Sequence, residues 1–365
     1  MDTKLVVIAI AAVVVVAAVG GYMLLNDDEE YDLIIAKGTA FTHEPTWIAD
    51  HFGLFEEEGL KVKFVTVDGG GTGMSALLAG RVDMTVSGAD PVVRMMQNSD
   101  DAKVVGMIEY AGVSGQMSFA TLDNSVDLSD PLTLLNAAGD GVRIHCGMDI
   151  NTAYYSNYLL YLKKALDESK ISTAQYDLLR GLRTGSSDGG IVSLEHGNIA
   201  SALLSGEVEM ILAADQITVA KEAGAAANPV IPVYDKYAAM PATAVFLSVS
   251  GKVLEEKSDA VLKAVRAYGK ACDLLNSERK SEMIEYCSEY GGMAIPNLTY
   301  AIGMFKWKLC QLENVESYLS DVAFALGEEG FDTTNRVTYE YLLEIYPDGM
   351  FVYNPNTNTY GAYAP

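Results

Sequence analysis

Apolar and polar positions along the chain predict short strands that alternate with helices. The predicted strands, in which apolar residues alternate with polar ones or run together, are residues 31–37, 61–67, 84–86, 104–110, 142–144 and 210–212. The predicted helices include residues 153–169, 257–275, 281–290 and 300–312. Strands that alternate with helices are typical of mostly parallel sheets, whose ligands bind beyond the carboxyl ends of the strands. We therefore expect an α/β fold with its binding site at such a sheet edge.

A ten-residue block occurs twice, as residues 75–84 and again 126 residues later as residues 201–210. Each copy predicts a short helix that ends at a glycine, Gly80 or Gly206, which supplies the left-handed turn that stops a helix. An acidic residue three positions later precedes an apolar strand in both copies. The spacing is too long for a stack of short repeats. The duplication therefore predicts two similar α/β lobes.

A run of apolar residues and glycine extends from Leu5 to Leu25 and is followed by the acidic residues 27–30. A helix over this run would be about 31 Å long, close to the ~30 Å hydrocarbon core of a bilayer. Cleaved signal peptides have shorter apolar stretches, and a helix that is apolar on every side has no face for water. Residues 1–30 are therefore predicted to be an uncleaved anchor that inserts through residues 5–25, with the rest of the chain outside the cytoplasm.

Composition and charge restrict the partners and the chemistry. The 365 residues are 50% hydrophobic and 20% charged, which is enough apolar material for a large core. The 25 basic and 49 acidic residues give a net charge of −24, which repels nucleic acids and anionic headgroups. The four cysteines form no CxxC pair, and the four histidines form no dense ligand motif. We therefore predict no nucleic-acid partner, no catalytic residue, no cofactor and no metal site.

The first half of the chain contains a series of short motifs in residues 33–36, 44–45, 48–60, 69–73 and 75–84. Together these segments resemble the extracytoplasmic solute-binding proteins of nitrate, sulfonate and taurine ABC transporters. They follow the family's order of strand, proline-containing loop, helix with Gly-Leu-Phe and Glu-Glu-Gly-Leu strings, strand and glycine-rich turn. The resemblance covers residues 33–106 closely and 142–224 more loosely. Gln216 departs from the family, which often has proline there.

The resemblance implies a two-lobed α/β fold of the periplasmic-binding-protein type 2 class, to which the apolar run at residues 5–25 adds an N-terminal transmembrane helix. Lobe 1 would comprise residues 31–125 and 240–365, and lobe 2 residues 140–235. The chain would be a monomeric substrate-binding component of an ABC importer at the extracytoplasmic face of the cell membrane. Its partners would be a small-molecule ligand, a permease and an ATPase.

Two other classes remain as alternatives. Enzymes that share this fold, namely pyrimidine-precursor synthases and deoxyfutalosine-pathway enzymes, would be cytoplasmic, so the predicted anchor argues against them. A sensory module would need a signalling domain on the cytoplasmic side, where only residues 1–4 are predicted to lie.

The candidate ligand-binding residues lie in loops that follow the predicted strands of both lobes. These residues are Thr42, His43, Gly70, Gly71, Thr72, Ser87, Gly88, Asp90, Asp149, Asn151, Thr152 and Asp215. The glycines either form a tight turn or let a ligand reach N–H groups at a helix start. Asp90 is favoured as a helix N-cap before Pro91, and one of the polar residues in 149–152 would cap the helix that follows.

A small organic anion such as a sulfonate is the expected ligand, because helix starts present N–H donors to anions. The basic residues that would assist it, unless they lie on the surface, are Arg81, Arg94 and Arg143. The acidic candidates would repel an anion. They would instead suit an amine, or a heterocycle near Trp47 or His43.

Overall fold

In the computed structural model, the chain divides after Asp32 into two units, residues 1–32 and residues 33–365. The residues that the structure describes are 30–39, 43–112, 118–137, 141, 143–150, 153–182, 189–213, 216–229, 244–291, 295, 298–299, 305–310, 315–328, 330–338, 340–345, 350–354 and 359–363. The predicted anchor, residues 5–25, lies outside them. Within these described ranges, no helix is long and apolar enough to cross a membrane.

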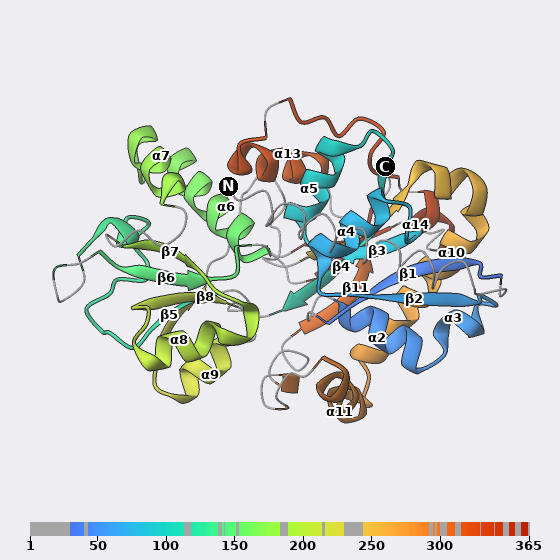
Figure 1. Cartoon of the computed structure of the whole chain (residues 1–365), viewed down its shortest axis with the longest axis horizontal. Helices are drawn as coiled ribbons and strands as arrows, with labels where there is room; N and C mark the ends of the chain where they lie inside the picture. The colour runs from blue at the N-terminus through green and yellow to red at the C-terminus, as the bar shows by residue number, and fades with distance from the viewer. Residues whose placement is uncertain are drawn as a thin grey trace, which may run out of the picture. The chain divides into compact units, whose positions relative to one another are not determined.

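The strands form two main sheets, which lie in separate lobes (Figure 1). The six-stranded sheet has the order β11-β4-β10-β3-β1-β2. Its strands are β1 (Leu33–Gly38), β2 (Val62–Val67), β3 (Met84–Ser87), β4 (Ala102–Gly112), β10 (Ala244–Ser250) and β11 (Phe305–Cys310). The five-stranded sheet has the order β7-β6-β8-β5-β9. Its strands are β5 (Ser118–Thr121), β6 (His145–Met148), β7 (Gly190–Ser193), β8 (Met210–Ala213) and β9 (Ala226–Pro229). A separate hairpin joins β12 (Met350–Asn354) and β13 (Thr359–Tyr363).

The two sheets share one topology. The strand next to one edge of each sheet, β1 or β6, is flanked by two parallel neighbours, which are β2 and β3 in the first lobe and β7 and β8 in the second. An antiparallel strand then follows in each sheet, β10 beside β3 and β5 beside β8. The repeated blocks lead into β3 and β8, which occupy equivalent places in different sheets. The prediction of two similar lobes is therefore confirmed.

The acidic residue of each block has the same role in its lobe. Asp83 Oδ2 accepts a hydrogen bond of 2.8 Å from Ile34 N, near the start of β1. Glu209 Oε2 accepts one of 2.7 Å from His145 N, at the start of β6. Each carboxylate thus satisfies a backbone N–H group of the neighbouring strand. The acid of the repeated block therefore makes the same strand–strand link in both lobes.

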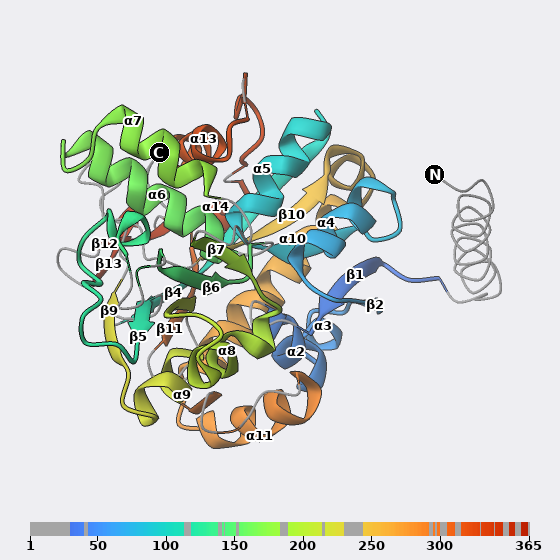
Figure 2. The same ribbon diagram turned by 60° about the vertical axis from the view of Figure 1, so that its left-hand side comes forward.

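The helices cover the faces of the sheets. In the first lobe they are α2 (Glu44–His51), α3 (Leu54–Glu57), α4 (Gly70–Leu78), α5 (Ala89–Asn98), α10 (Gly251–Leu275), α11 (Lys280–Gly291) and α14 (Glu340–Ile345). In the second lobe they are α6 (Ala153–Asp167), α7 (Thr173–Gly181), α8 (Ile199–Ser205) and α9 (Gln216–Glu222). Helix α13 (Val315–Leu326) packs against both α5 and α6, and so touches both lobes (Figure 1 and Figure 2).

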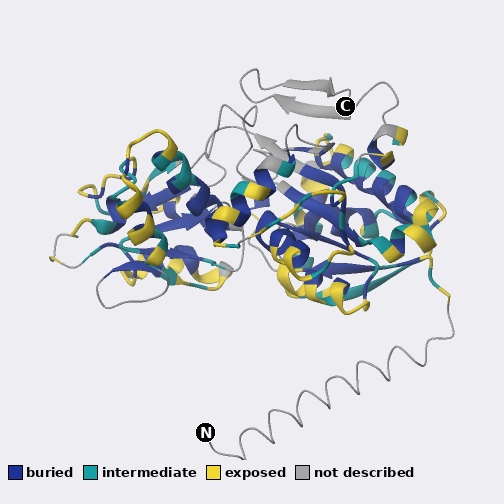
Figure 3. Ribbon diagram, turned by 90° about the horizontal axis from the view of Figure 1, so that it is seen from above, coloured by how far each residue is buried: buried dark blue, intermediate teal, exposed yellow. Residues whose placement is uncertain are grey.

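The buried apolar residues form two clusters, and buried positions follow the strands of both lobes (Figure 3). One cluster fills the space between the first sheet and α2, α3 and α10, and contains Trp47 and Trp307. The other begins with Met74 and Val92 on the opposite side of that sheet and continues into the second lobe. The second cluster therefore joins the lobes through packed side chains.

The structure differs from the sequence prediction in three places. Residues 300–312 were expected to be helical, but 305–310 form β11, which pairs antiparallel with β4 and buries Trp307 completely. The prediction of a helix there is therefore wrong. The strand expected at 142–144 instead begins at His145. Strand β5 lies in the second sheet although it precedes residue 125, because it pairs with β8 and β9. The exact lobe boundaries stay a prediction.

Candidate functional site

A cleft of about 620 Å³ lies between α4 and α5 and is bordered by the second lobe. Its lining residues are Gly71, Met74, Ser75 and Leu78 from α4, Asp90, Pro91, Arg94, Met95 and Asn98 from α5, and Ile150 and Tyr155 from the second lobe. Helix α4 follows β2, α5 follows β3, and Ile150 follows β6. Two helices that follow strand ends and the turn after β6 therefore border this cleft, and ligands in such sheets bind beyond the carboxyl ends of the strands. We call this space the α4–α5 cleft.

The glycine-rich turn at the start of α4 divides into packing and cleft-facing positions. A Cβ atom at Gly70 would lie 2.7 Å from Ser87 Cβ, and one at Gly73 would lie 2.3 Å from Thr85 Oγ1. These two glycines let α4 lie directly on β3. A Cβ at Gly71 would meet nothing within 4 Å, because this position faces the cleft. The backbone that a ligand can approach is therefore that of Gly71.

Replacing Gly73 by alanine is expected to destabilise the protein by about 1–3 kcal/mol, the usual effect of overpacking a core. The new methyl group would clash with the fully buried Thr85 side chain. The Thr85 hydroxyl has no hydrogen-bond partner among the described residues. The double variant Gly73→Ala/Thr85→Ala is therefore expected to recover most of the loss, as measured by urea unfolding.

Gly71→Ala is the matched control, because it adds the same methyl group to the same helix where space is open. The higher helix propensity of alanine predicts a stability that is unchanged or higher by up to about 1 kcal/mol. Equal losses at the two positions would show that the close approach of α4 to β3 is not the reason for Gly73.

Thr72 closes the first turn of α4. Its Oγ1 donates to Gly69 O at 2.9 Å, and Gly69 N lies 3.1 Å from the same oxygen. This hydroxyl therefore stabilises the turn that carries Gly71. Its proposed ligand contact stays a prediction.

The N-cap residue of α5 is not the one that the sequence favoured. Helix α5 begins at Ala89 with Gly88 as its N-cap residue, so Asp90 lies within the first turn and is not the cap. The Asp90 carboxylate accepts a hydrogen bond of 2.7 Å from Arg94 Nε, one helical turn further on. Arg94 also lies 3.5 Å from Glu328, just beyond α13. Ser87 is fully buried at the end of β3.

His43 lies at the carboxyl end of β1, directly before α2, and is fully buried. Its ring packs so closely on Gly38 that a Cβ there would lie 2.5 Å from it. Neither ring nitrogen has a hydrogen-bond partner among the described residues. Burial lowers the pKa of His43 to about 4, so the ring is neutral near pH 7. Buried polar groups are almost always hydrogen-bonded, so these nitrogens are suited to a ligand or a trapped water.

Four of the sequence-predicted site residues, Thr42, Asn151, Thr152 and Asp215, lie outside the described residues. Asp149 is half-buried directly after β6. Of the other predicted residues, the structure brings Gly71 and Asp90 together in the α4–α5 cleft. The ligand-binding roles of all twelve remain predictions.

Several residues that line the cleft were not among the predicted site residues. These are Met74, Ser75, Leu78, Pro91, Met95, Asn98, Ile150 and Tyr155, whereas Arg94, which also lines the cleft, was expected as an assisting basic residue. A helical spacing of three or four residues relates the α4 and α5 members of this set, which is the only local signal for them. Ile150 and Tyr155 join the site through the contact between lobes.

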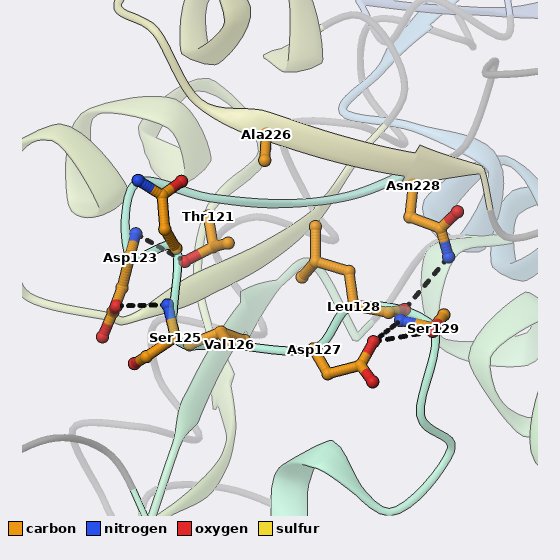
Figure 4. A pocket seen from close by; sticks show the side chains of 10 residues that line it. Thr121, Asp123, Ser125, Val126, Asp127, Leu128, Ser129, Ala226 and Asn228 are labelled. Atoms are coloured by element: carbon orange, nitrogen blue, oxygen red, sulfur yellow. Dashed lines mark hydrogen bonds between the residues drawn. The ribbon is translucent and has the colours of Figure 1, made fainter.

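A second cavity, of about 440 Å³, lies in the second lobe between residues 121–129 and β9 (Figure 4). Its acidic groups are engaged in local turns. Asp123 Oδ1 accepts from Ser125 N at 2.8 Å, and Asp127 Oδ1 accepts from Ser129 N at 2.9 Å and Ser129 Oγ at 2.6 Å. These bonds lower the pKa of both carboxyl groups. The cavity contains none of the predicted site residues, so we favour the α4–α5 cleft.

In the part of the chain that the structure describes, no group of three or more His, Cys, Asp or Glu residues could hold a metal ion.

Comparisons with known proteins give a consistent picture. A family model described as the NMT1-like family matches residues 27–288. No curated protein matches the sequence. Among solved structures, the alkanesulfonate-binding protein SsuA from Xanthomonas axonopodis pv. citri, bound to MOPS, is 14% identical with a TM-score of 0.60, over 84% of this chain and 98% of that chain.

Two further structures are similar to the same extent. The periplasmic aliphatic sulphonate-binding protein SsuA from Escherichia coli is 14% identical with a TM-score of 0.62, over 84% of this chain and 90% of that chain. The periplasmic nitrate-binding protein NrtA from Synechocystis PCC 6803 is 12% identical with a TM-score of 0.59, over 87% of this chain and 88% of that chain. At these identities the likeness concerns the fold. It confirms the predicted two-lobed α/β fold of the periplasmic-binding-protein type 2 class.

Proposed function

The chain belongs to the NMT1-like family, and on that premise we propose that it is the substrate-binding component of an ABC importer. The observation that carries this proposal is that the α4–α5 cleft is lined by side chains from both lobes. A ligand that contacts both lobes favours the arrangement in which they are closed, by as much as its affinity for that arrangement exceeds its affinity for the open one. The closed form would then dock on a permease whose ATPase partner supplies the energy.

The ligand that we propose is a small organic solute with an acidic group, such as a sulfonate. The similar proteins SsuA and NrtA are described as binding sulfonates and nitrate. Helices α4 and α5 both start at the cleft, and N–H groups at helix starts favour anions. The Asp90 carboxylate does not oppose this, because Arg94 pairs with it. His43 would donate or accept one further hydrogen bond.

Enzymes that share this fold remain the alternative, and no specific observation favours them. In the described lining of the α4–α5 cleft, the carboxylate and the guanidinium are Asp90 and Arg94, which bond to each other. The proposed importer component lowers no chemical barrier and needs only differential binding to two arrangements of its lobes.

A thermal-shift screen of the purified full chain with alkylsulfonates, amino acids and pyrimidines tests the proposal. A ligand at about 100 times its Kd is expected to add ~2.7 kcal/mol to the free energy of unfolding. Small-angle scattering should also show a smaller radius of gyration with the ligand than without it. Stabilisation by pyrimidines or amines but not by sulfonates would reject the acidic ligand. Turnover of any bound compound would reject the binding-protein function.

We further propose that residues 5–25 hold the protein at the extracytoplasmic face of the membrane. The support for this is the length of the apolar run. Carbonate extraction of membranes is expected to leave the protein in the pellet. A mature N-terminus beyond residue 25 would contradict the anchor.

A further inference from the structure

Helix α13 is attached to the first lobe at both of its ends. It follows β11, an edge strand of the six-stranded sheet. Beyond the helix, Val104 N donates a hydrogen bond of 2.8 Å to Arg336 O, and Thr338 N donates one of 2.9 Å to Val104 O. The buried Arg336 side chain also donates a hydrogen bond of 2.8 Å to Asp100 Oδ1. These bonds hold the segment after α13 to β4 and to the turn after α5, so α13 belongs to the first lobe.

The same helix packs on α6 of the second lobe (Figure 1 and Figure 2). Lys163 of α6 makes the polar part of this contact, because its Nζ lies 3.9 Å from Asp321 Oδ1 and 5.5 Å from the centre of the Phe324 ring. The side chains of Lys163 and Asp321 are only 13% and 15% exposed. Helix α7 also reaches the end of α13, where a Cβ at Gly327 would lie 2.2 Å from Arg180 Nη2. Removing one partner of a largely buried ion pair leaves the other charge uncompensated, which is costly.

The contact between α13 and α6 lies away from the ligand-lining part of α6. Tyr155 is the α6 residue that lines the α4–α5 cleft, and Lys163 follows it by about 12 Å at 1.5 Å per residue. The apolar cluster that joins the lobes passes through α13, from which Tyr318 and Val322 are buried in it. If the lobes move apart, this packing must break on one side of α13. Because the first lobe holds both ends of the helix, the α6 side is the one that separates.

We propose that the contact between α13 and α6 is a latch, which forms when the lobes close and breaks when they open. Lys163 is then a positioning residue, which holds the second lobe over the cleft without touching the ligand. The latch supplies part of the free energy of closure and the ligand supplies the rest. A larger closed population raises the apparent affinity by the same factor, so the latch tunes the affinity for any ligand. This inference rests on the two lobe arrangements of the proposed function, whatever the ligand is.

Distances between two spin labels, measured by pulsed electron resonance on the full chain without added ligand, test the latch. The labels are attached to Glu255→Cys in α10 and Ser201→Cys in α8, which are exposed positions in different lobes. A protein without these two cysteines gives the background signal from the native thiols. Lys163→Met keeps the hydrocarbon stem and removes the charge. It is expected to lower the ratio of short-distance to long-distance populations by about three- to tenfold.

Lys164→Met is the matched control, because Lys164 is the next residue of α6 and forms its ion pair, at 3.7 Å, with Glu168 of the same lobe. Its distance ratio is expected to equal that of the parent protein. Asp321→Asn weakens the latch from the first lobe and is expected to act in the same direction as Lys163→Met, so it decides the question if the latter variant does not fold.

Three results would overturn the latch. They are equal ratios in the parent protein and both latch variants, an equal fall in Lys164→Met, and a parent protein that shows the long distance alone. All three leave the proposed function intact, because that function fails only if no added compound stabilises the chain or shortens the distance.

Discussion

Replacing Trp47 by alanine is expected to lower the free energy of unfolding by about 3–5 kcal/mol, the range for removing a large aromatic side chain from a core. Trp47 is fully buried in α2. Its ring centroid lies 5.3 Å from that of Tyr290, and Gly291 leaves room for the ring, because a Cβ there would lie 2.6 Å from it. Trp47 Nε1 also donates a hydrogen bond of 2.6 Å to Gly38 O. The substitution therefore removes packing and leaves a buried carbonyl without its donor.

Trp47→Phe separates these two effects, because it keeps most of the apolar volume and removes only the donor and part of the ring. Its expected effect is about 1–3 kcal/mol. The chain has two tryptophans, and the other, Trp307, is fully buried in β11. In both variants, Trp307 fluorescence and circular dichroism can therefore follow urea unfolding. A loss below 1 kcal/mol for alanine would contradict the proposed role of Trp47 in the core.

Lowering the pH from 6.5 to 4 is expected to remove stability on the order of 3 kcal/mol through His43 alone. Burial lowers the pKa of His43 from 6.5 to about 4 in the folded protein. The unfolded chain therefore binds the proton first. The contribution of His43 to the free energy of unfolding is therefore fully present above pH 6.5 and is lost as the pH falls toward 4. Urea unfolding at several pH values measures this loss.

His43→Phe is the control, because phenylalanine keeps the ring shape and cannot be protonated. The carboxyl groups of the chain are the same in both proteins, so the difference between the two pH profiles reports His43. The variant is expected to be at least as stable as the parent protein at pH 7, since two unpartnered nitrogens are removed. It is also expected to bind the ligand more weakly. Identical pH profiles would show that the ring is not buried and neutral, and unchanged binding would remove His43 from the site.

The fold could be predicted where local pattern and tertiary structure agree. Strands β1, β2, β3 and β8 were expected within a few residues, because each is a short apolar segment between turn signals. Strand β11 was missed although Phe-Lys-Trp-Lys-Leu-Cys alternates apolar and basic residues, the period of a strand. Its neighbours in the sequence are helical in pattern. Its pairing partner β4, in which Tyr110 lies opposite Trp307, is almost 200 residues away.

The candidate site could be predicted only in part. Gly71 and Asp90 follow strand ends and were therefore foreseeable. The Asp90–Arg94 pair has a helical i, i+4 spacing that indicates such a bond, but the expected helix start was placed two residues too late. Tyr155 carries no local signal, because its place in the cleft depends on where α6 meets the first lobe.

The copied acids Asp83 and Glu209 also determine how each lobe is aligned. Each carboxylate bonds one particular N–H group, that of Ile34 or His145, at the edge of the sheet opposite the ligand loops. A slip of β1 or β6 by one residue would move that group by about 3.3 Å and turn its buried face outward. The hydrogen bonds of these two acids therefore help to fix the register of β1 and β6 against their neighbouring strands. In this way they fix where the carboxyl ends of β1 and β6 lie relative to their neighbouring strands, and so where the loops that follow these strands can contact a ligand.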